Sequence, residues 1–194
     1  MNFYKLIVAI LCCFFTNVSL AQADNNPPAK QYKFALYAGV GPNIYFNNLV
    51  VAKSYVHELN YSVSGRIMWE PGHLLSLGIE TGYYKMYSVN DKSQSAVNIS
   101  NAIVPFQLVV GMKFLKTFYC DFSAGQSLLI NKVSTPDNGN ISSTSYSLGD
   151  FGLSVGYRRQ VKERISISAE VKLFYSSQLN DKNMALLFMV GYKL

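Results

Sequence analysis

The segment between Arg164 and Tyr175 constrains the fold of this chain most, because apolar and polar side chains alternate along it. Its apolar positions are Ile165, Ile167, Ala169, Val171 and Leu173, and its polar positions are Arg164, Ser166, Ser168, Glu170 and Lys172. Side chains of a β-strand alternate between two faces, so one face here is apolar and the other is charged. Strands of soluble sandwiches usually run about five to six residues, whereas a membrane-spanning strand needs roughly nine to eleven. The length therefore favours an apolar face that meets lipid.

The amino terminus has the composition of a secretory signal peptide. Lys5 supplies a positive charge, residues 6–15 form an apolar run, and small residues follow at spacings that suit cleavage after Ala21 or Ala23. The apolar run is shorter than the roughly 20 residues of a membrane-spanning helix. We therefore predict a signal peptide over residues 1–21, a short polar linker over 22–31 and one domain over 32–194.

The predicted domain contains eight strand candidates and no apolar stretch long enough for a helical membrane span. The candidates lie near residues 32–41, 58–69, 74–87, 97–114, 116–130, 144–159, 164–176 and 184–194. The connections near Pro71, Leu115 and Val161 are tight, and the others are longer and rich in Asn, Asp and Ser: 42–57, 88–96, 131–143 and 177–183. Short turns at one end and long loops at the other are typical of outer-membrane barrels. We therefore predict an all-β fold, an eight-stranded antiparallel up-and-down transmembrane β-barrel in the outer membrane.

The alternation of side chains also predicts a polar barrel interior. In the strand near residues 58–69, Ser64 and Arg66 would face inward, whereas Val63, Ile67 and Trp69 would face outward. The charged residues predicted to face inward are Arg66, Glu80, Lys113, Asp121, Asp150, Arg158, Glu170 and Lys172. An eight-stranded barrel encloses little more than its own side chains, so unpaired charges there would be costly. We therefore predict a structural network of ion pairs, with a proton or ion path as the alternative.

Aromatic residues gather near the predicted ends of the strands. Six of them would point outward at the end with the tight turns, which we assign to the periplasm: Phe34, Trp69, Phe114, Phe118, Tyr157 and Tyr192. A second group would lie at the opposite end: Tyr61, Tyr83, Tyr87 and Tyr175. Aromatic rings favour the headgroup region of a bilayer, so we predict an aromatic girdle at each interface.

One strand carries the strongest family resemblance. The segment from Asn101 to Phe114, Asn-Ala-Ile-Val-Pro-Phe-Gln-Leu-Val-Val-Gly-Met-Lys-Phe, resembles the strand signature of the PorT-like outer-membrane β-barrel family. Residues 39–42 and 190–194 are similar to that family as well, although such barrels commonly end on an aromatic residue and this chain ends on Leu194. The resemblance implies an outer-membrane barrel and raises a role in protein secretion. Pro105 cannot donate to a strand ladder, so we expect a bulge or irregular pairing there.

Catalytic motifs are sparse. The sequence has two histidines, His57 and His73, too few for a histidine metal cluster. A barrel enzyme that modifies lipids would need a serine, a histidine and an acid together, and Ser54, His57 and Glu58 are the only local candidates. No recognised motif surrounds them. We therefore predict no enzymatic activity, no cofactor and no metal.

Charge and cysteine content limit the partners. The full chain carries a net charge of +6, and loss of Lys5 with the leader leaves 16 basic against 11 acidic residues. These charges are scattered, so anionic lipid headgroups are a better partner than nucleic acid. Cys120 would be the single cysteine left after cleavage, which excludes an intrachain disulfide. We take Cys120 as a small apolar residue on the outward face of its strand.

The sequence thus predicts a non-enzymatic outer-membrane barrel with a structural, surface-interaction or secretion-accessory role. Its predicted partners are outer-membrane lipids and, through extracellular loops, other envelope proteins. An outer-leaflet lipid-modifying enzyme and a narrow pore stay open as alternatives. A secreted lipocalin-like binder also stays open, but it would require an apolar lumen.

Overall fold

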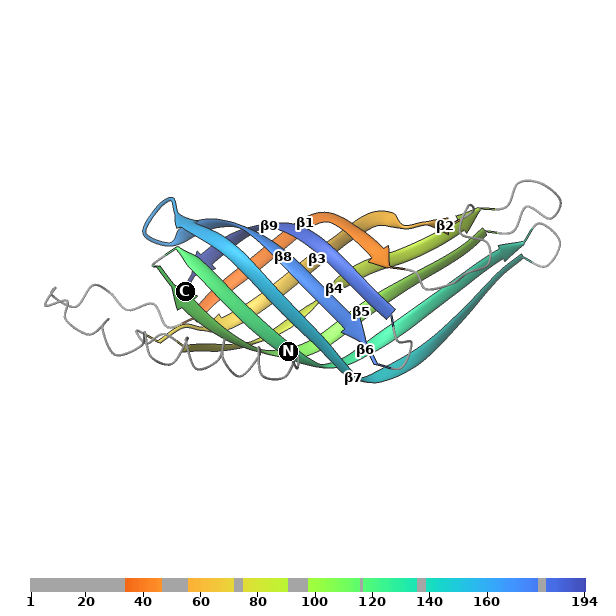
Figure 1. Ribbon diagram of the computed structural model, residues 1–194, viewed down its shortest axis with the longest axis horizontal. Coiled ribbons are helices and arrows are strands. Elements are labelled where there is room, and N and C mark those ends of the chain that lie inside the picture. The colour runs from red at the N-terminus through yellow and green to blue at the C-terminus, as the bar shows by residue number, and fades with distance from the viewer. Residues whose placement is uncertain are drawn as a thin grey trace, which may run out of the picture. The chain divides into compact units, whose positions relative to one another are not determined.

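Nine antiparallel strands account for almost all of the residues that the computed structural model describes, which are 34–46, 56–71, 75–90, 98–115, 117–135, 139–177 and 181–194. The strands are β1 (Phe34–Phe46), β2 (Val56–His57), β3 (Leu59–Trp69), β4 (Leu75–Asn90), β5 (Asn98–Phe114), β6 (Phe118–Thr135), β7 (Gly139–Gln160), β8 (Ile165–Ser176) and β9 (Asp181–Lys193) (Figure 1). The predicted signal peptide and linker lie outside the described residues. Among the described residues, no helix is long and apolar enough to cross a membrane.

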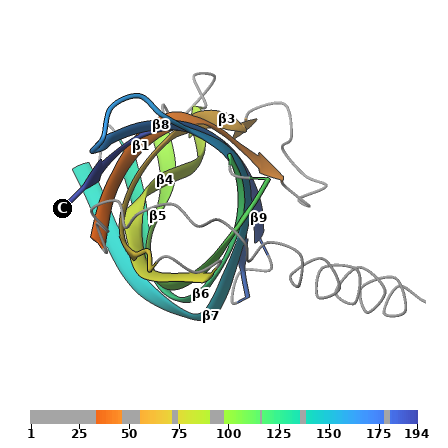
Figure 2. The same ribbon diagram turned by 90° about the vertical axis from the view of Figure 1, so that its left-hand side faces the viewer.

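The eight long strands close into a barrel. Each pairs antiparallel with its neighbour along the chain, and β1 also pairs with β9, from Ala35 opposite Lys193 to Phe46 opposite Lys182. The view along the barrel shows the closed ring (Figure 2). The short strand β2 adds two further pairs to β4, with Val56 opposite Val89 and His57 opposite Ser88. The predicted eight-stranded up-and-down barrel is therefore confirmed.

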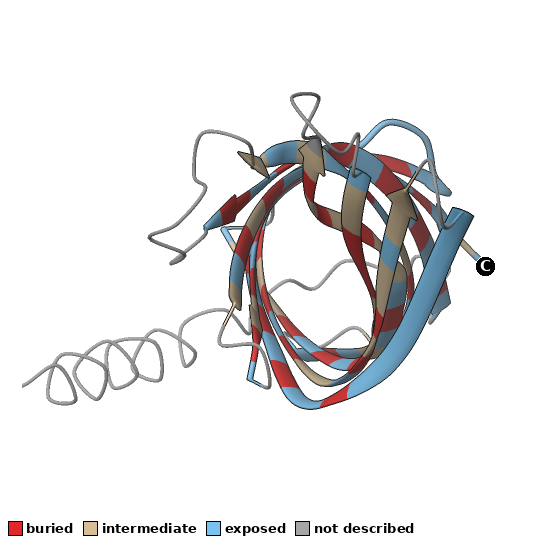
Figure 3. Cartoon of the chain, turned by 90° about the vertical axis from the view of Figure 1, so that its right-hand side faces the viewer, coloured by how far each residue is buried: buried red, intermediate tan, exposed pale blue. Residues whose placement is uncertain are grey.

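Burial alternates along the strands with a period of two (Figure 3). In β1 the alternation runs without a break from Phe34 to Phe46. On β5 the outward Leu108 is 69% exposed, whereas Val109 beside it is 1% exposed. A water-soluble protein rarely exposes a contiguous apolar surface of this kind, so the outer wall of the barrel is suited to lipid. Cys120 lies on this outward face and is half-buried.

The connection predicted over residues 131–143 is wrong. Strand β6 continues to Thr135, and β7 begins at Gly139, so the two strands form a long hairpin in which Lys132 pairs with Ser142 and Val133 with Ile141. All eight residues from Gly139 to Tyr146 are exposed. The backbone ladder holds this hairpin together without burying an apolar face, so the alternation that marks a membrane strand is absent from its sequence.

Two other strands also extend beyond their predicted ends. Strand β1 continues through Pro42 to Phe46, and β4 continues to Asn90, so the loops predicted to begin at residues 42 and 88 begin later. Pro42 lies opposite Tyr61 in the register of β1 and β3. On the side of the long connections, β4, β5, β6 and β7 reach beyond the ends of β1, β8 and β9 (Figure 1).

Pro105 interrupts one ladder without a bulge. On the β6 side it lies opposite Ser127 in continuous register. On the β4 side the pairs pass from Thr81–Phe106 to Tyr84–Ile103, with the same register before and after the gap. The irregular pairing expected at the proline is therefore present, because its nitrogen has no hydrogen to donate.

The register shift between β4 and β5 lies instead between Lys85 and Tyr87. It turns Tyr87 toward the interior, where its ring centroid lies 5.1 Å from that of Tyr45. Tyr87 packs against the buried apolar cluster of the lumen. Its predicted place in the girdle opposite the tight turns is therefore wrong, since the bulge changes the direction of the Tyr87 side chain.

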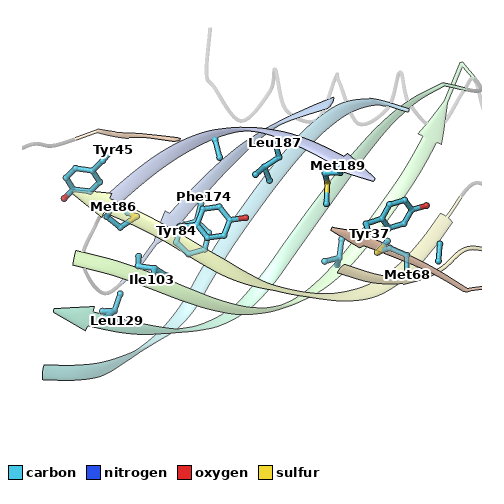
Figure 4. Packing of buried hydrophobic residues seen from close by; sticks show 13 residues of the cluster. Tyr37, Tyr45, Met68, Tyr84, Met86, Ile103, Leu129, Phe174, Leu187 and Met189 are labelled. Atoms are coloured by element: carbon cyan, nitrogen blue, oxygen red, sulfur yellow. The ribbon is translucent and has the colours of Figure 1, made fainter. Parts of the chain in front are cut away.

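Toward the tight turns and toward the long connections alike, apolar side chains fill parts of the lumen (Figure 4). Met86, Ile103 and Leu187 are 0% exposed there, and Tyr84 stacks on Phe174 with ring centroids 6.0 Å apart. The sequence predicted a mostly polar interior, and these buried apolar side chains add to that predicted lining. Apolar side chains therefore share the lumen with the charged residues.

Candidate functional site

Arg66 is the centre of a buried ion cluster in the barrel. Its Nε donates to Glu80 Oε2 at 2.8 Å, its Nη1 to Asp121 Oδ2 at 2.5 Å and its Nη2 to Glu170 Oε1 at 2.9 Å. The side chains of Arg66, Glu80 and Glu170 are at most 1% exposed, and that of Asp121 is 5% exposed. Strand alternation brings these residues together, because each faces inward from a different strand: Arg66 from β3, Glu80 from β4, Asp121 from β6 and Glu170 from β8.

Lys172 joins this cluster through a charge-assisted hydrogen bond to Glu80. Two tyrosines complete it: Tyr119 donates to Glu170 Oε2 at 2.7 Å, and Tyr84 donates to Glu80 Oε1 at 3.3 Å. The cluster thus holds two cations against three carboxylates, with nearly every oxygen of the carboxylates engaged. Such a buried arrangement is costly to disturb and supports the structural interpretation of the charges.

Glu70 forms a second charged site at the end of the barrel with the tight turns. Its Oε1 lies 2.7 Å from Arg158 Nη1, and its Oε2 lies 2.6 Å from Lys113 Nζ. Tyr37 donates to Glu70 Oε1 at 2.7 Å, and the Arg158 guanidinium lies 4.2 Å from the centroid of the Tyr37 ring. Burial raises the pKa of Glu70, but Arg158 and Lys113 outweigh burial and lower it to about 2.

The eight predicted lumen charges therefore separate into three places. Arg66, Glu80, Asp121, Glu170 and Lys172 meet in the central cluster. Lys113 and Arg158 pair instead with Glu70, which was not among the predicted residues. Glu70 has the same parity as Arg66 and Met68, so continued alternation would have placed it inward, but the predicted strand ended at Trp69 and left Glu70 in the turn.

Asp150 lies apart from both charged sites. It accepts a hydrogen bond from Ser147 Oγ at 2.7 Å and another from the Ser177 backbone nitrogen at 3.1 Å. In the part of the chain that the structure describes, no cation pairs with it. Asp150 therefore fixes the place where β7 leaves β8, rather than balancing a lumen cation.

The predicted periplasmic aromatic residues share one end of the barrel. Phe118 packs against Phe114 and against Tyr157, with ring centroids 6.0 and 5.3 Å apart, and Phe34 lies opposite Trp69. Five of the six are exposed on the outer wall, and Phe114 is half-buried. At the other end, the Tyr61 and Tyr83 rings lie 6.0 Å apart. The role of these rings as girdles remains a prediction.

The residues considered for an enzyme do not assemble into a described site. His57 is exposed on β2, where it lies opposite Ser88 and its backbone oxygen accepts from Asn60 Nδ2 at 2.9 Å. Ser54 and His73 lie outside the described residues. Among the described residues, no group of histidines, cysteines and carboxylates could hold a metal ion.

The β6–β7 hairpin presents an open strand edge. Strand β7 pairs with β6 from Gly139 onward, but its pairing with β8 begins only at Phe151. Among the described strands, none pairs with the second edge of residues 139–147. Ile141 and Tyr146 on this segment are 60% and 71% exposed. The hairpin thus offers unpaired backbone donors and acceptors together with apolar side chains.

Comparison with known proteins identifies the architecture. A family model described as the outer membrane protein beta-barrel domain matches residues 9–193. The chain belongs to this outer-membrane β-barrel family. The match does not single out PorT-like members, so that narrower resemblance remains a prediction. Among curated proteins, no sequence matches the chain.

Several solved structures of small barrels are similar to the chain. Ail, the attachment invasion locus protein of Yersinia pestis, in complex with the heparin analogue sucrose octasulfate, is 9% identical, with a TM-score of 0.56 over 83% of this chain and 97% of that one. Neisserial surface protein A is 14% identical, with a TM-score of 0.46 over 84% and 97%. The N-terminal barrel of Pseudomonas aeruginosa OprF is 11% identical, with a TM-score of 0.47 over 82% and 98%. At these identities the likeness to Ail shows the fold alone.

Proposed function

We propose that this outer-membrane barrel is a non-enzymatic surface-interaction protein that binds extended polypeptide at the open edge of β7. The observation that carries this proposal is the β6–β7 hairpin, whose residues 139–147 pair with β6 on one side only among the described strands. An exposed strand edge is a template on which a further strand can add, with main-chain hydrogen bonds supplying the affinity.

The composition of this edge supports the proposal. Natural proteins usually protect an exposed edge with lysine, proline or inward charges, yet residues 139–147 read Gly-Asn-Ile-Ser-Ser-Thr-Ser-Tyr-Ser. The segment carries no charge and no proline. Its alternate side chains would contact an added strand on both faces, since successive residues point to opposite sides.

The position of the hairpin supports the same role. In outer-membrane barrels the longer connections face outward from the cell and the tight turns face the periplasm. The hairpin rises from the end with the longer connections, beyond the ends of β1, β8 and β9 (Figure 1). The description of Ail names attachment for that protein, and an attachment role would suit the hairpin of this one. We extend the proposal to export by a cleaved signal peptide.

Peptide selection tests the proposal directly. A phage-displayed library of unstructured peptides would be panned on proteoliposomes that contain the protein, and we expect enrichment of extended sequences with high β-propensity. One variant replaces residues 132–142 by an Asn-Gly turn, which shortens the hairpin. A second, Ser142→Lys with Thr144→Lys, places charges on the edge, and Gln160→Lys at the opposite end serves as the matched control.

The three variants separate the outcomes. We expect the shortened hairpin and the double lysine variant to lose binding of the selected peptides, and Gln160→Lys to keep it. Retention of binding by the shortened hairpin, or a wild-type protein that selects no peptide, would refute strand addition as its function.

A further inference from the structure

We infer that the outer wall of the barrel carries a binding site for one anionic glycerophospholipid at the junction of β7, β8 and β9. The site has an apolar part and a cationic part, and Arg159 belongs to both. It is independent of the hairpin and of the surface role proposed above, because it lies at the opposite end of the strands.

The apolar part is a groove of about 460 Å³ on the lipid-facing wall. Ala169 forms its floor, with Tyr157 opposite it on β7 and Phe188 opposite it on β9. Tyr157 is 44% exposed and Phe188 is 59% exposed, so two large side chains stand on either side of a small one. A groove of this shape can bind an acyl chain that runs along the barrel wall.

Arg159 lies at the end of this groove nearest the tight turns. It pairs with Ile167 across β7 and β8, and Ile167 in turn pairs with Val190. These residues lie two positions further along the strands than Tyr157, Ala169 and Phe188, a separation of about 7 Å at 3.3 Å per residue. Arg159 is exposed and, in the part of the chain that the structure describes, forms no ion pair. Its long side chain can reach from the apolar wall toward the headgroups.

The cationic part is a pocket of about 240 Å³ at the mouth of the barrel. Its charged lining consists of four cations, Lys113, Arg158, Arg159 and Lys193, and one carboxylate, Glu70. The excess of positive charge favours a phosphate group. Because Arg159 lines the groove and the pocket alike, a phospholipid could place its chain in one and its phosphate at the other.

A second groove on the barrel provides an internal comparison. It has a volume of about 310 Å³ and lies over Gly65, where an added Cβ would meet no atom within 4 Å. Its outward side chains include Leu36, Ile79 and Phe106. The charged residues beside it, Arg66 and Glu80, are buried inside the barrel. This groove can hold any acyl chain, but it offers no outward charge to select a headgroup.

Native mass spectrometry of the detergent-released protein tests the inference. The protein would be mixed with equal amounts of phosphatidylglycerol and phosphatidylethanolamine that carry the same chains. We expect one phosphatidylglycerol retained per barrel. Loss of an arginine near an anionic headgroup corresponds to about 1 kcal/mol, so Arg159→Gln should lower its occupancy about fivefold. Ala169→Leu fills the groove and should lower it as well.

Two controls match these changes. Lys162→Gln removes the same charge from the β7–β8 turn outside both parts of the site, and Gly65→Leu fills the second groove. Both should keep the wild-type occupancy, and all four variants should keep heat-modifiable gel mobility. Equal retention of the two lipids, an equal loss in Lys162→Gln and Arg159→Gln, or a protein dimer in place of the lipid adduct would overturn the inference.

Discussion

Arg66 and Glu170 are 104 positions apart in the sequence, yet Nη2 of Arg66 lies 2.9 Å from Oε1 of Glu170. Strand β3 carries the first residue and β8 the second, and two other strands, β1 and β9, lie between them in the sheet. The contact therefore crosses the lumen rather than following the wall. Together with Asp121 on β6, it ties distant parts of the ring to one guanidinium.

Removing Arg66 should destabilise the barrel strongly. Arg66→Ala would leave the carboxylates of Glu80, Asp121 and Glu170 buried without their shared cation, and breaking a buried ion pair from one side costs about 3–5 kcal/mol. Urea unfolding in lipid vesicles measures the change. Lys162→Ala, an exposed cation of the β7–β8 turn, should change the free energy of unfolding by less than about 0.5 kcal/mol. An equally small change for Arg66→Ala would show that the cluster does not support the fold.

Two positions on β7 test where the membrane ends. Val155 is 49% exposed on the barrel wall and Ile141 is 60% exposed on the hairpin. Arginine near the midplane of a bilayer costs about 2–4 kcal/mol. Val155→Arg should therefore lower the free energy of unfolding by that amount and reduce the yield of assembled barrel. Ile141→Arg should have little effect, because we expect the hairpin to extend beyond the bilayer. Similar effects of the two substitutions on heat-modifiable mobility would contradict this placement.

The depressed pKa of Glu70 predicts a pH-dependent stability. Arg158 and Lys113 lower that pKa from 4.5 to about 2, so the ionised carboxylate stabilises the folded state. This contribution is fully present above pH 4.5 and is lost as the pH falls toward 2. We expect Glu70→Gln to be less stable than the wild type at pH 7 and the difference to shrink between pH 4.5 and 2. A difference that stays constant with pH would contradict the assignment, and Glu163→Gln in the β7–β8 turn is the control.

The filled lumen predicts that the barrel does not conduct ions. Met86, Ile103 and Leu187 are fully buried in the lumen, and eight strands leave little room beyond the side chains themselves. Planar bilayers that contain the purified protein should show no sustained current steps. Reproducible ion-selective steps that disappear in Arg66→Ala or Glu80→Ala would establish a pore.

The membrane part of the barrel was predictable because lipid and lumen impose opposite polarities on successive residues. Val63, Ser64, Gly65, Arg66 and Ile67 already display that contrast in the sequence. The hairpin was not predictable, because the residues of its two strands do not alternate between apolar and polar, and the ladder between residues 131–135 and 139–143 does not depend on such alternation. A composition rich in Ser and Asn predicts a loop, whether the segment is an irregular loop or an exposed hairpin.

The charged sites were predictable only in part for a related reason. Inward direction follows from alternation, so Arg66, Glu80 and Glu170 could be placed on the lumen side. Their partners depend on how far each strand is staggered around the ring, which a single strand does not reveal. Tyr87 follows a bulge, where alternation fails, and Glu70 was left out because the predicted strand ended one residue before it.

Closure of the ring through β1 and β9 has a consequence for biogenesis. The first and last strands of the barrel are neighbours, so β1 has no partner on one side until residues 181–193 arrive. Until then β1 and β8 each keep a bare edge, and every unsatisfied backbone group in hydrocarbon costs several kcal/mol. Insertion therefore cannot be completed while the polypeptide is still being delivered. A premature stop codon anywhere before Asp181 should act as a null allele, with no graded loss of activity.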